Sequence, residues 1–273
     1  MKSKDLYPAI FSRHAAAYDR RLDQIMARGE ARGRQRVLDL VDARPGMRVL
    51  DLACGPGNLA WRLAALVAPD GEVVGVDLAP GMIELARRRS VRNARFEVMD
   101  IEQLAFPNAS FDAAVCGHGL QFAPHLDVAM SEARRVLREE SRFAASLPLG
   151  SPSQAVQELL DKVINRRLPP APRAVDQEKT RRITADADAL MRAALEAGFA
   201  SAKVELVEEK VVWESAEQLV AMCASWWDCA ARLEEVDEER RQDFVDEAID
   251  VLRRDHPGAI ETTGRNFVLF AVA

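Results

Sequence analysis

Carboxylates mark three successive apolar runs of this sequence, and glycines follow the first run. Asp51 lies in the first run, which leads into a turn with Gly55 and Gly57. Asp77 ends the second run, and Asp100 directly follows the third. Carboxylate oxygens accept hydrogen bonds from ammonium, hydroxyl and amino groups, and the N–H groups of a glycine turn can hold an anion. The pattern therefore predicts a binding site for a ligand that carries all of these groups.

The three acids meet only if their runs are neighbouring strands of one sheet. Apolar runs and turn signals predict alternating strands and helices. We expect strands at 47–53, 72–77, 95–99, 111–116 and 142–148, and helices at 57–68, 80–89 and 126–139. This alternation favours a doubly wound, mostly parallel sheet with helices on both faces, which would place the acids at one carboxyl edge.

Further helices flank this alternation. Residues 1–44 predict N-terminal helices that close the cleft, and residues 45–150 predict the Rossmann-like core. Residues 151–273 should complete the core sheet and carry helical lid insertions at about 151–175 and 215–258. In this last part we expect a helix at 186–197, strands at 202–213 and 266–272, and two lid helices at about 215–233 and 237–254.

Two kinds of cofactor suit a glycine turn after a strand. S-adenosylmethionine (SAM) presents an ammonium, a carboxylate, a ribose diol and an adenine, so it needs acidic acceptors and no diphosphate cradle. A nicotinamide or flavin dinucleotide is the alternative, because Gly55, Gly57 and Ala60 also fit the dinucleotide fingerprint. Asp51 argues against it, since a carboxylate beside the loop would repel pyrophosphate. The chain also shows no second mononucleotide-binding half.

Longer motifs extend the pattern. Residues 49–58, 75–82 and 99–102 resemble motifs I, II and III of class I SAM-dependent methyltransferases. Residues 104–112, 116–121 and 132–137 are similar to the ubiquinone/menaquinone C-methyltransferase branch (methyltransferase type 11) of that family. The resemblance covers residues 45–148 and implies a Rossmann-like, seven-stranded sheet with an antiparallel last strand. Residues 215–258 differ from the quinone enzymes, so we expect another acceptor.

The resemblance also implies roles for residues in this sequence. The glycine turn would hold the methionine part of SAM, Asp77 the ribose hydroxyls and Asp100 the adenine amino group. Leu78 and Met82 would sandwich the adenine ring. The implied cofactor-binding residues are Tyr18, Asp51, Ala53, Gly55, Pro56, Gly57, Asp77, Leu78, Met82, Asp100, Ile101 and Gly117. Tyr18 would close the cleft from the N-terminal helix, or it is only a packing aromatic of that helix.

Methyl transfer from a sulfonium is a displacement that mainly needs donor and acceptor aligned in a dry pocket. A general base helps by roughly 10²–10⁴-fold if the nucleophile is a phenol or an acidic carbon. His118 is the candidate base, because it follows the fourth strand at the carboxyl edge of the sheet. The alternative is that His118 only lines the pocket. His14, on the N-terminal helix, is the weaker candidate.

Aromatic residues near the cleft and in the lid suggest an acceptor pocket. Gln121 and Phe122 follow the fourth strand, and Trp226 and Trp227 lie in the first lid helix. We expect Trp226 to pack inward with Leu219, Met222, Ala230 and Leu233, and Trp227 to point along a neighbouring face. These tryptophans would form an aromatic wall for a planar or isoprenoid acceptor, or simply the core of the lid.

Composition narrows the classes of protein and partner. The net charge is −6 with no strongly basic block, which disfavours nucleic acid as a partner. No stretch approaches the roughly 20 apolar residues of a spanning helix, so we expect a cytoplasmic protein that does not enter membranes. The four cysteines form no CxxC pair, and we expect reduced thiols and no metal. The chain is expected to be a monomer or a homodimer.

The leading hypothesis is a SAM-dependent methyltransferase that acts on carbon, oxygen or nitrogen of a small hydrophobic metabolite, with natural-product biosynthesis as its setting. A second hypothesis is a cyclase or pericyclase that uses the SAM fold on a polyketide or terpenoid, with or without methylation as the trigger. RNA methylation is a lesser alternative, which the acidic balance disfavours.

Overall fold

One twisted sheet forms the centre of the molecule. The computed structural model describes residues 1–149 and 155–273. Across these residues the order of the seven strands is β3-β2-β1-β4-β5-β7-β6. The strands from β3 to β5 run parallel, whereas β7 is antiparallel to both β5 and β6. The predicted fold class is therefore confirmed. The strands are β1 (Arg48–Leu52), β2 (Glu72–Asp77), β3 (Ala94–Val98), β4 (Phe111–Gly117), β5 (Leu137–Leu149), β6 (Ser201–Trp213) and β7 (Ile260–Val272).

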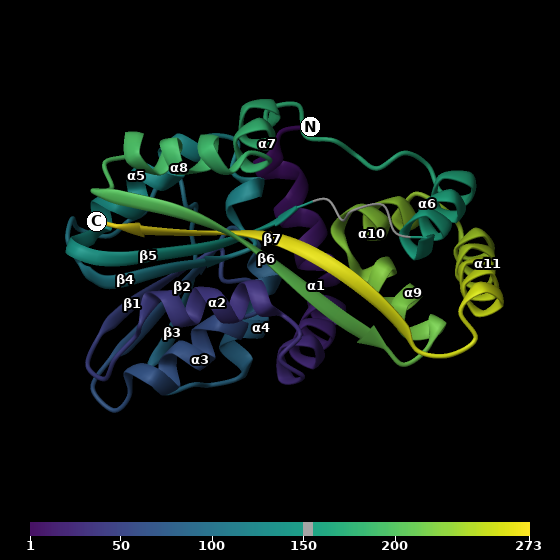
Figure 1. Ribbon diagram of the computed structural model, residues 1–273, viewed down its shortest axis with the longest axis horizontal. Helices are drawn as coiled ribbons and strands as arrows, with labels where there is room; N and C mark the ends of the chain where they lie inside the picture. The colour runs from purple at the N-terminus through teal and green to yellow at the C-terminus, as the bar shows by residue number, and fades with distance from the viewer. Residues whose placement is uncertain (150–154) are drawn as a thin grey trace.

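Helices cover both faces of this sheet. The helices α2 (Arg32–Val41), α3 (Asn58–Val67) and α4 (Pro80–Arg88) pack on one face, and α5 (Leu126–Val136) and α8 (Ala187–Glu196) pack on the other. Figure 1 shows these two layers, with α1 (Ser3–Ala27, purple) beside the carboxyl ends of the parallel strands. The remaining helices are η1 (Leu120–Phe122), α6 (Ala155–Arg167), α7 (Glu178–Thr184), α9 (Ala216–Ser225), α10 (Trp227–Glu234) and α11 (Glu238–Asp255).

The central strands are buried on both faces, which explains why they read as continuous apolar runs. Val49 packs with the layer of α2 and α3, whereas its neighbour Leu50 packs with the layer of α5 and α8. Both side chains have no exposed surface. Removing a side chain like Leu50 down to alanine would cost about 2–5 kcal/mol of folding free energy. This burial fixes the carboxyl ends of β1, β2 and β4 relative to one another.

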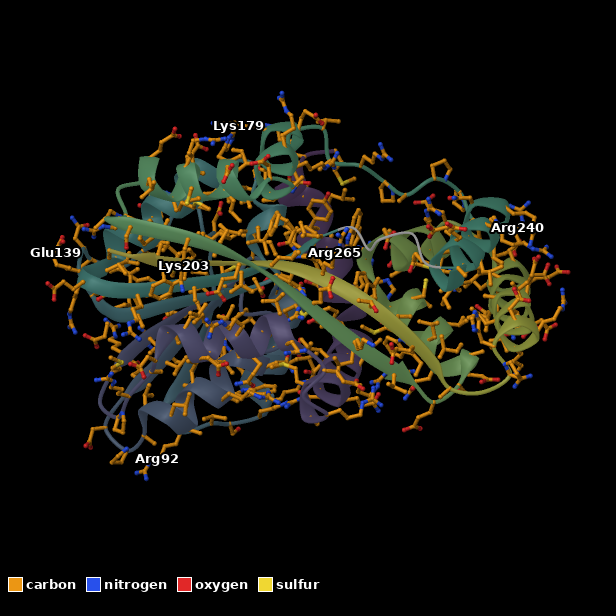
Figure 2. The ribbon with its side chains drawn as sticks, viewed as in Figure 1. Arg92, Glu139, Lys179, Lys203, Arg240 and Arg265 are labelled. Carbon is orange, nitrogen blue, oxygen red and sulfur yellow. The ribbon has the colours of Figure 1, made fainter. Side chains whose placement is uncertain are left out.

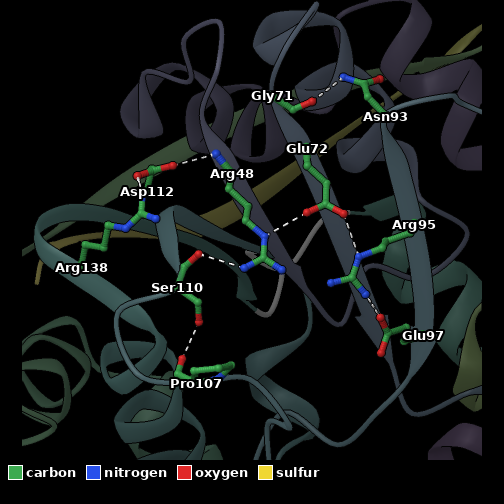
Figure 3. Close-up of polar contacts among 10 residues, drawn as sticks. All are labelled: Arg48, Gly71, Glu72, Asn93, Arg95, Glu97, Pro107, Ser110, Asp112 and Arg138. Carbon is green, nitrogen blue, oxygen red and sulfur yellow. Dashed lines mark hydrogen bonds and ion pairs between the residues drawn. The ribbon is translucent and has the colours of Figure 1, made fainter.

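Ion pairs fasten the opposite, amino edge of the parallel strands. Glu72 at the start of β2 accepts from Arg48 of β1 at 2.9 Å and from Arg95 of β3 at 2.8 Å (Figure 3). Asp112 of β4 accepts from the backbone N–H of Arg48 at 2.8 Å. These charges lie at the strand starts, whereas the acids of interest lie at the strand ends. The ion pairs of the amino edge therefore help to fix the register between neighbouring parallel strands.

Charged side chains occupy the periphery of the molecule. Figure 2 shows Glu139, Lys179 and Arg240 projecting outward from three separate parts of the chain. Within the described residues, no helix combines the length and the apolar character that crossing a bilayer requires. The same residues hold no group of three or more His, Cys, Asp or Glu side chains placed to bind a metal ion.

Three sequence predictions about elements need correction. The predicted helix 126–139 ends at Val136, because the chain pairs with β4 from Leu137 onward through a β-bulge between Phe111 and Ala113. The first lid helix is two helices, since the backbone at Trp226 is extended, with ψ 145°. The last strand begins at Ile260 rather than 266, and it pairs with β6 along its whole length.

The two insertions lie together beyond the end of the β6–β7 hairpin. The helices α9, α10 and α11 connect β6 to β7, and α6 packs against α11 (Figure 1). Helix α7, which the sequence did not predict, packs beside η1. The predicted insertion at 151–175 begins in a part of the chain that lies outside the described residues, as does the boundary at 150. The division into three parts stays a prediction.

Candidate active site

A cavity lies at the carboxyl edge of the parallel strands, under α1. Its walls come from α1, from the loops that follow β1, β2, β3 and β4, and from Arg34 of α2. The residues that line it are Ser3, Lys4, Tyr7, Pro8, Phe11, Tyr18, Leu22, Arg34, Asp51, Ala53, Cys54, Gly55, Pro56, Asn58, Leu59, Asp77, Leu78, Ala79, Met82, Asp100, Ile101, Glu102, Gly117, His118, Gly119, Phe122, Ala123 and Pro124. Ligands of doubly wound sheets bind at this edge.

The carboxylate of Asp77 accepts a hydrogen bond from the glycine turn after β1. The backbone N–H groups of Gly55 and Ala79 donate to the two oxygens of this carboxylate, each at 2.8 Å. Gly55 and Gly57 have φ values of 55° and 88°, a region that glycine enters without strain. The turn then leads into α3, so that the amino end of a helix faces the cavity at Asn58. Such helix ends favour anions.

Asp51 is a buried carboxylate whose two oxygens have no hydrogen bond of good geometry within the described residues, although the backbone N–H of Ala60 at the start of α3 approaches it. Only 1% of its surface is exposed. Burial, together with the nearby carboxylate of Asp77, raises the pKa of Asp51 to about 8. Unpaired buried acceptors are costly, so this position fits a ligand with a hydrogen-bonding cation, such as an ammonium group.

Arg34 faces the same end of the cavity from α2, and the sequence analysis missed it. Its guanidinium donates to the hydroxyl of Tyr18 at 3.1 Å, and its charge lowers the pKa of Asp51. Arg34 is 8% exposed and shares the buried face of α2 with Val37, Leu38 and Val41. That placement was the available signal, since an arginine on the apolar face of a helix needs a partner there. A ligand carboxylate is the partner that its planar fork matches.

The other end of the cavity is closed by Lys4, in the first turn of α1. Its ammonium lies 2.6 Å from Asp100 and 2.6 Å from Glu102. Both carboxylates raise the pKa of Lys4 through hydrogen bonds, although burial acts in the opposite direction. Asp100 also accepts from the backbone N–H of Glu102 at 2.9 Å. The Asp100 carboxylate is therefore tied to the first turn of α1.

Aromatic side chains form the wall between these two ends. Phe122 packs against Tyr7 and Phe11, with ring centroids 4.9 and 5.2 Å apart. Phe11 also meets Tyr18 edge to face. The hydroxyl of Tyr7 donates to Gln177 at 2.8 Å, and Tyr7 lines the cavity. Apart from Gln177 these residues come from α1 and η1, so α1 supplies most of this wall.

Comparisons with known proteins agree with this geometry. The family described as "Methyltransferase domain" matches residues 49–140. A demethylmenaquinone methyltransferase of Symbiobacterium thermophilum is 34% identical over 140 residues, which cover 49% of this chain and 55% of the relative. The ubiquinone/menaquinone biosynthesis C-methyltransferase UbiE of Coxiella burnetii is 33% identical over 205 residues, which cover 70% of this chain and 81% of the relative. The chain belongs to the class I SAM-dependent methyltransferases, and it is similar to their UbiE type.

The fold of a solved structure agrees with this membership. The YcgJ protein of Bacillus subtilis superposes with a TM-score of 0.56 at 17% identity, over 88% of this chain and 97% of that one. The chain spans 55% of the length of the Symbiobacterium enzyme. For two other curated relatives the matched share of their length is 38% and 62%.

The residues of the cavity fit the SAM of this methyltransferase family. Asp51 and Arg34 offer a carboxyl group and a guanidinium to the amino-acid part, and the loop after β1 leaves space above Gly55, where nothing lies within 4 Å of an added Cβ. Asp77, Leu78 and Met82 line the next part of the cavity, followed by Asp100 and Ile101. Of the twelve implied cofactor residues, Gly57 alone does not line the cavity; its α-carbon packs toward Phe96 and Trp61.

Only some of the predicted acceptor-pocket residues and candidate bases line this methyltransferase cavity. Phe122 and His118 line it, whereas Gln121, Trp226, Trp227 and His14 do not. Gln121 donates to the backbone oxygen of His118 at 2.9 Å. His14 lies 2.8 Å from Glu234 of α10.

The expectation that Trp226 packs inward is wrong. Its side chain is 49% exposed, because α9 ends just before it and the extended backbone turns it outward. Trp227 lies behind the aromatic wall instead, 5.0 Å from the ring of Tyr7 and 6.4 Å from that of Phe122. The inward tryptophan of the lid is therefore Trp227, and it supports the wall without lining the cavity.

Proposed function

We propose that this chain methylates a small, uncharged aromatic acceptor at carbon, oxygen or nitrogen, with SAM as the donor. The observation that carries the proposal is that Asp51, a buried carboxylate with no hydrogen bond of good geometry, and Arg34 both line one end of the cavity. This pair matches the ammonium and carboxylate of an amino acid. A pyrophosphate would meet the charge of Asp51, so a dinucleotide is disfavoured.

The aromatic wall supports the choice of acceptor. The wall that α1 and η1 supply between the two charged ends consists of Tyr7, Pro8, Phe11, Tyr18 and Phe122, none of which carries a formal charge at neutral pH. A charged acceptor packed against this wall would lose hydration without finding a partner in the wall. A planar ring would gain edge-to-face contacts with this wall. The names of the relatives, which concern menaquinone and ubiquinone, also favour a ring as the acceptor.

The protein's contribution to the reaction is alignment and exclusion of water. SAM, when bound, supplies an electrophilic methyl group on a sulfonium. Asp51, Arg34 and the glycine turn would orient its amino-acid part, and Asp77 its ribose. Helix α1 covers the cavity, which keeps water from the reacting atoms. His118, which lines the cavity, would accept the acceptor's proton if the nucleophile is a phenol or an acidic carbon.

Titration calorimetry with S-adenosylhomocysteine, followed by an acceptor panel, tests the proposal. We expect micromolar binding of S-adenosylhomocysteine, no binding of NAD, and one S-adenosylhomocysteine formed per methylated phenol or quinol. Binding of NAD in place of S-adenosylhomocysteine would refute the cofactor assignment. Turnover without S-adenosylhomocysteine would favour the cyclase hypothesis, and methylation of transfer RNA instead of the panel would favour the RNA hypothesis. Natural-product biosynthesis and the cytoplasm stay predictions.

A further inference from the structure

Two consecutive residues before α7 hold the start of α1. Asp176 accepts from the backbone N–H of Ser3 at 2.9 Å. The next residue, Gln177, accepts from the hydroxyl of Tyr7 at 2.8 Å. These contacts join residues that lie 173 and 170 positions apart in the chain, so no local pattern could indicate them. The first two turns of α1 are therefore placed by the segment that follows α6.

The side-chain amide of Gln177 also binds the backbone of η1. Its Nε2 donates to the backbone oxygen of Phe122 at 2.6 Å and to that of Gln121 at 3.3 Å. A backbone oxygen can only accept, so the amide group that faces these two oxygens must be the N–H₂. The amide oxygen is then the atom that faces Tyr7, and it receives the hydroxyl hydrogen. One amide thus joins the second turn of α1 to η1, in an orientation that its partners fix.

The place of Gln177 in its own helix makes this use of its side chain unusual. Gln177 is the N-cap residue of α7, a position whose side chain commonly accepts from the first N–H groups of the helix. Here the side chain makes no such bond, and the residue is only 2% exposed. A buried amide is costly unless it is hydrogen-bonded, and both groups of this one have partners. The side chain therefore serves the contact between α1 and η1.

The two aromatic residues that this amide joins both line the cavity. The rings of Tyr7 and Phe122 have centroids 4.9 Å apart and planes inclined at 56°. Trp227, which does not line the cavity, packs edge to face on Tyr7 with centroids 5.0 Å apart. Tyr7 is thus held through its hydroxyl by Gln177 and through its ring by two aromatic neighbours. The spacing of this part of the wall accordingly depends on Gln177.

We propose that Gln177 is a positioning residue for the methyl acceptor: its amide fixes Tyr7 and Phe122 relative to each other, and this spacing selects the acceptor ring. The inference rests on the proposed function and adds a determinant of acceptor choice to it. Gln177 acts through the two aromatic residues, since it does not itself line the cavity. The acceptor must approach the methyl group in line with the sulfonium, so a shifted wall impairs its binding and alignment.

NMR of protein labelled with ¹³C at Cζ of tyrosine tests the contact without SAM or acceptor. The chain has two tyrosines, Tyr7 and Tyr18, so Tyr7→Phe assigns both signals. Gln177→Met keeps the length of the side chain and removes its hydrogen-bonding groups, so the Tyr7 signal should move while the Tyr18 signal stays. Thr180→Val is the control, because Thr180 also binds the backbone beside η1, donating to the oxygen of Ala123 at 2.8 Å. A Tyr7 signal that Gln177→Met leaves in place would overturn the proposal.

Kinetics with a one-ring phenol and a two-ring naphthol then test the role in acceptor choice. Gln177→Met and Tyr7→Phe should each raise KM for the preferred acceptor roughly 5- to 20-fold. The affinity for S-adenosylhomocysteine should change less than about twofold, since its proposed partners Asp51 and Arg34 have no part in this contact. The double variant should show little further rise in KM, because either change breaks the same hydrogen bond. Thr180→Val should leave KM near the wild-type value.

The variant Gln177→Glu gives a readout that lost stability would not produce. A protonated carboxyl can still donate to Phe122 and accept from Tyr7, whereas a carboxylate would face two backbone oxygens. With SAM saturating, the acceptor KM of Gln177→Glu should be close to that of wild type near pH 6 and approach that of Gln177→Met near pH 9. If wild type methylates neither acceptor, the proposed function fails and this role fails with it. If wild type methylates one and Gln177→Met keeps its KM, the role of Gln177 alone is refuted.

Discussion

The ammonium of Lys4 lies 2.6 Å from Oδ2 of Asp100, so that α1 is tied by its first turn to the loop after β3. Glu102 shares the same ammonium at 2.6 Å. Asp100 is also the residue that the family resemblance assigns to the adenine amino group. Closure of α1 and recognition of adenine therefore involve one carboxylate. Loss of this contact would free the first turn of α1 from the loop after β3, which lines the same end of the cavity.

Substitution Lys4→Met should therefore speed the exchange of S-adenosylhomocysteine. The loss of a charge-assisted contact should raise its dissociation rate about 5- to 20-fold, and added salt should produce part of this effect in wild type. Stopped-flow tryptophan fluorescence measures the rates. Lys179→Met is the matched control, because Lys179 pairs with Asp127 at 2.9 Å on the surface outside the cavity. Equal dissociation rates in wild type and Lys4→Met would contradict the closing role.

The raised pKa of Asp51 predicts a pH-dependent affinity for the cofactor. A bound ammonium favours the carboxylate, so binding below the pKa of about 8 must release a proton. The association constant of S-adenosylhomocysteine should rise roughly tenfold per unit between pH 6 and 7 and level off toward pH 8. Asp51→Asn should bind weakly with a flat profile. Calorimetry in buffers of different ionisation enthalpy counts the proton, and its absence in wild type would count against Asp51 as the ammonium partner.

The same pKa implies that Asp51 lowers the stability of the ligand-free protein. Its folded pKa lies above the unfolded value, so the unfolded chain loses this proton more readily as the pH rises from 4 to 8. Asp51→Asn should accordingly melt several degrees above wild type at pH 8, with a smaller difference at pH 5. Thermal unfolding followed by circular dichroism checks this, and a lower melting temperature for Asp51→Asn at pH 8 would be the contrary result.

Local patterns predicted the strands well and the long-range pairs poorly. The strand Glu72–Asp77 was predicted to the residue, because both faces are buried and a proline and a glycine precede it. Lys4 was missed, since nothing in the first turn of α1 indicates that it meets Asp100. Trp226 continued a helical apolar stripe, yet a local break in the helix turned it outward. Periodicity reports the face of a continuous helix, and it carries no information about such breaks.

Arg34→Met should weaken binding of S-adenosylhomocysteine by roughly 10- to 100-fold, because a buried guanidinium–carboxylate contact is lost. Arg34→Lys should recover little, since an ammonium lacks the planar fork. Arg36→Met is the control on the same helix: Arg36 pairs with Glu205 at 2.8 Å, outside the cavity. Titration calorimetry of the three variants with S-adenosylhomocysteine measures these affinities. Tight binding by Arg34→Met would remove Arg34 from the cofactor site.

The adjacent tryptophans of the lid should differ sharply in their contribution to stability. Trp227 packs edge to face on Tyr7, with ring centroids 5.0 Å apart, so Trp227→Ala opens a gap behind the aromatic wall and should cost about 2–4 kcal/mol of unfolding free energy. Trp226→Ala removes a side chain that is 49% exposed and should cost less than about 0.5 kcal/mol. Urea unfolding at constant pH measures both. The reverse order would mean that Trp226, and not Trp227, packs against the body of the protein, as its helical spacing had suggested.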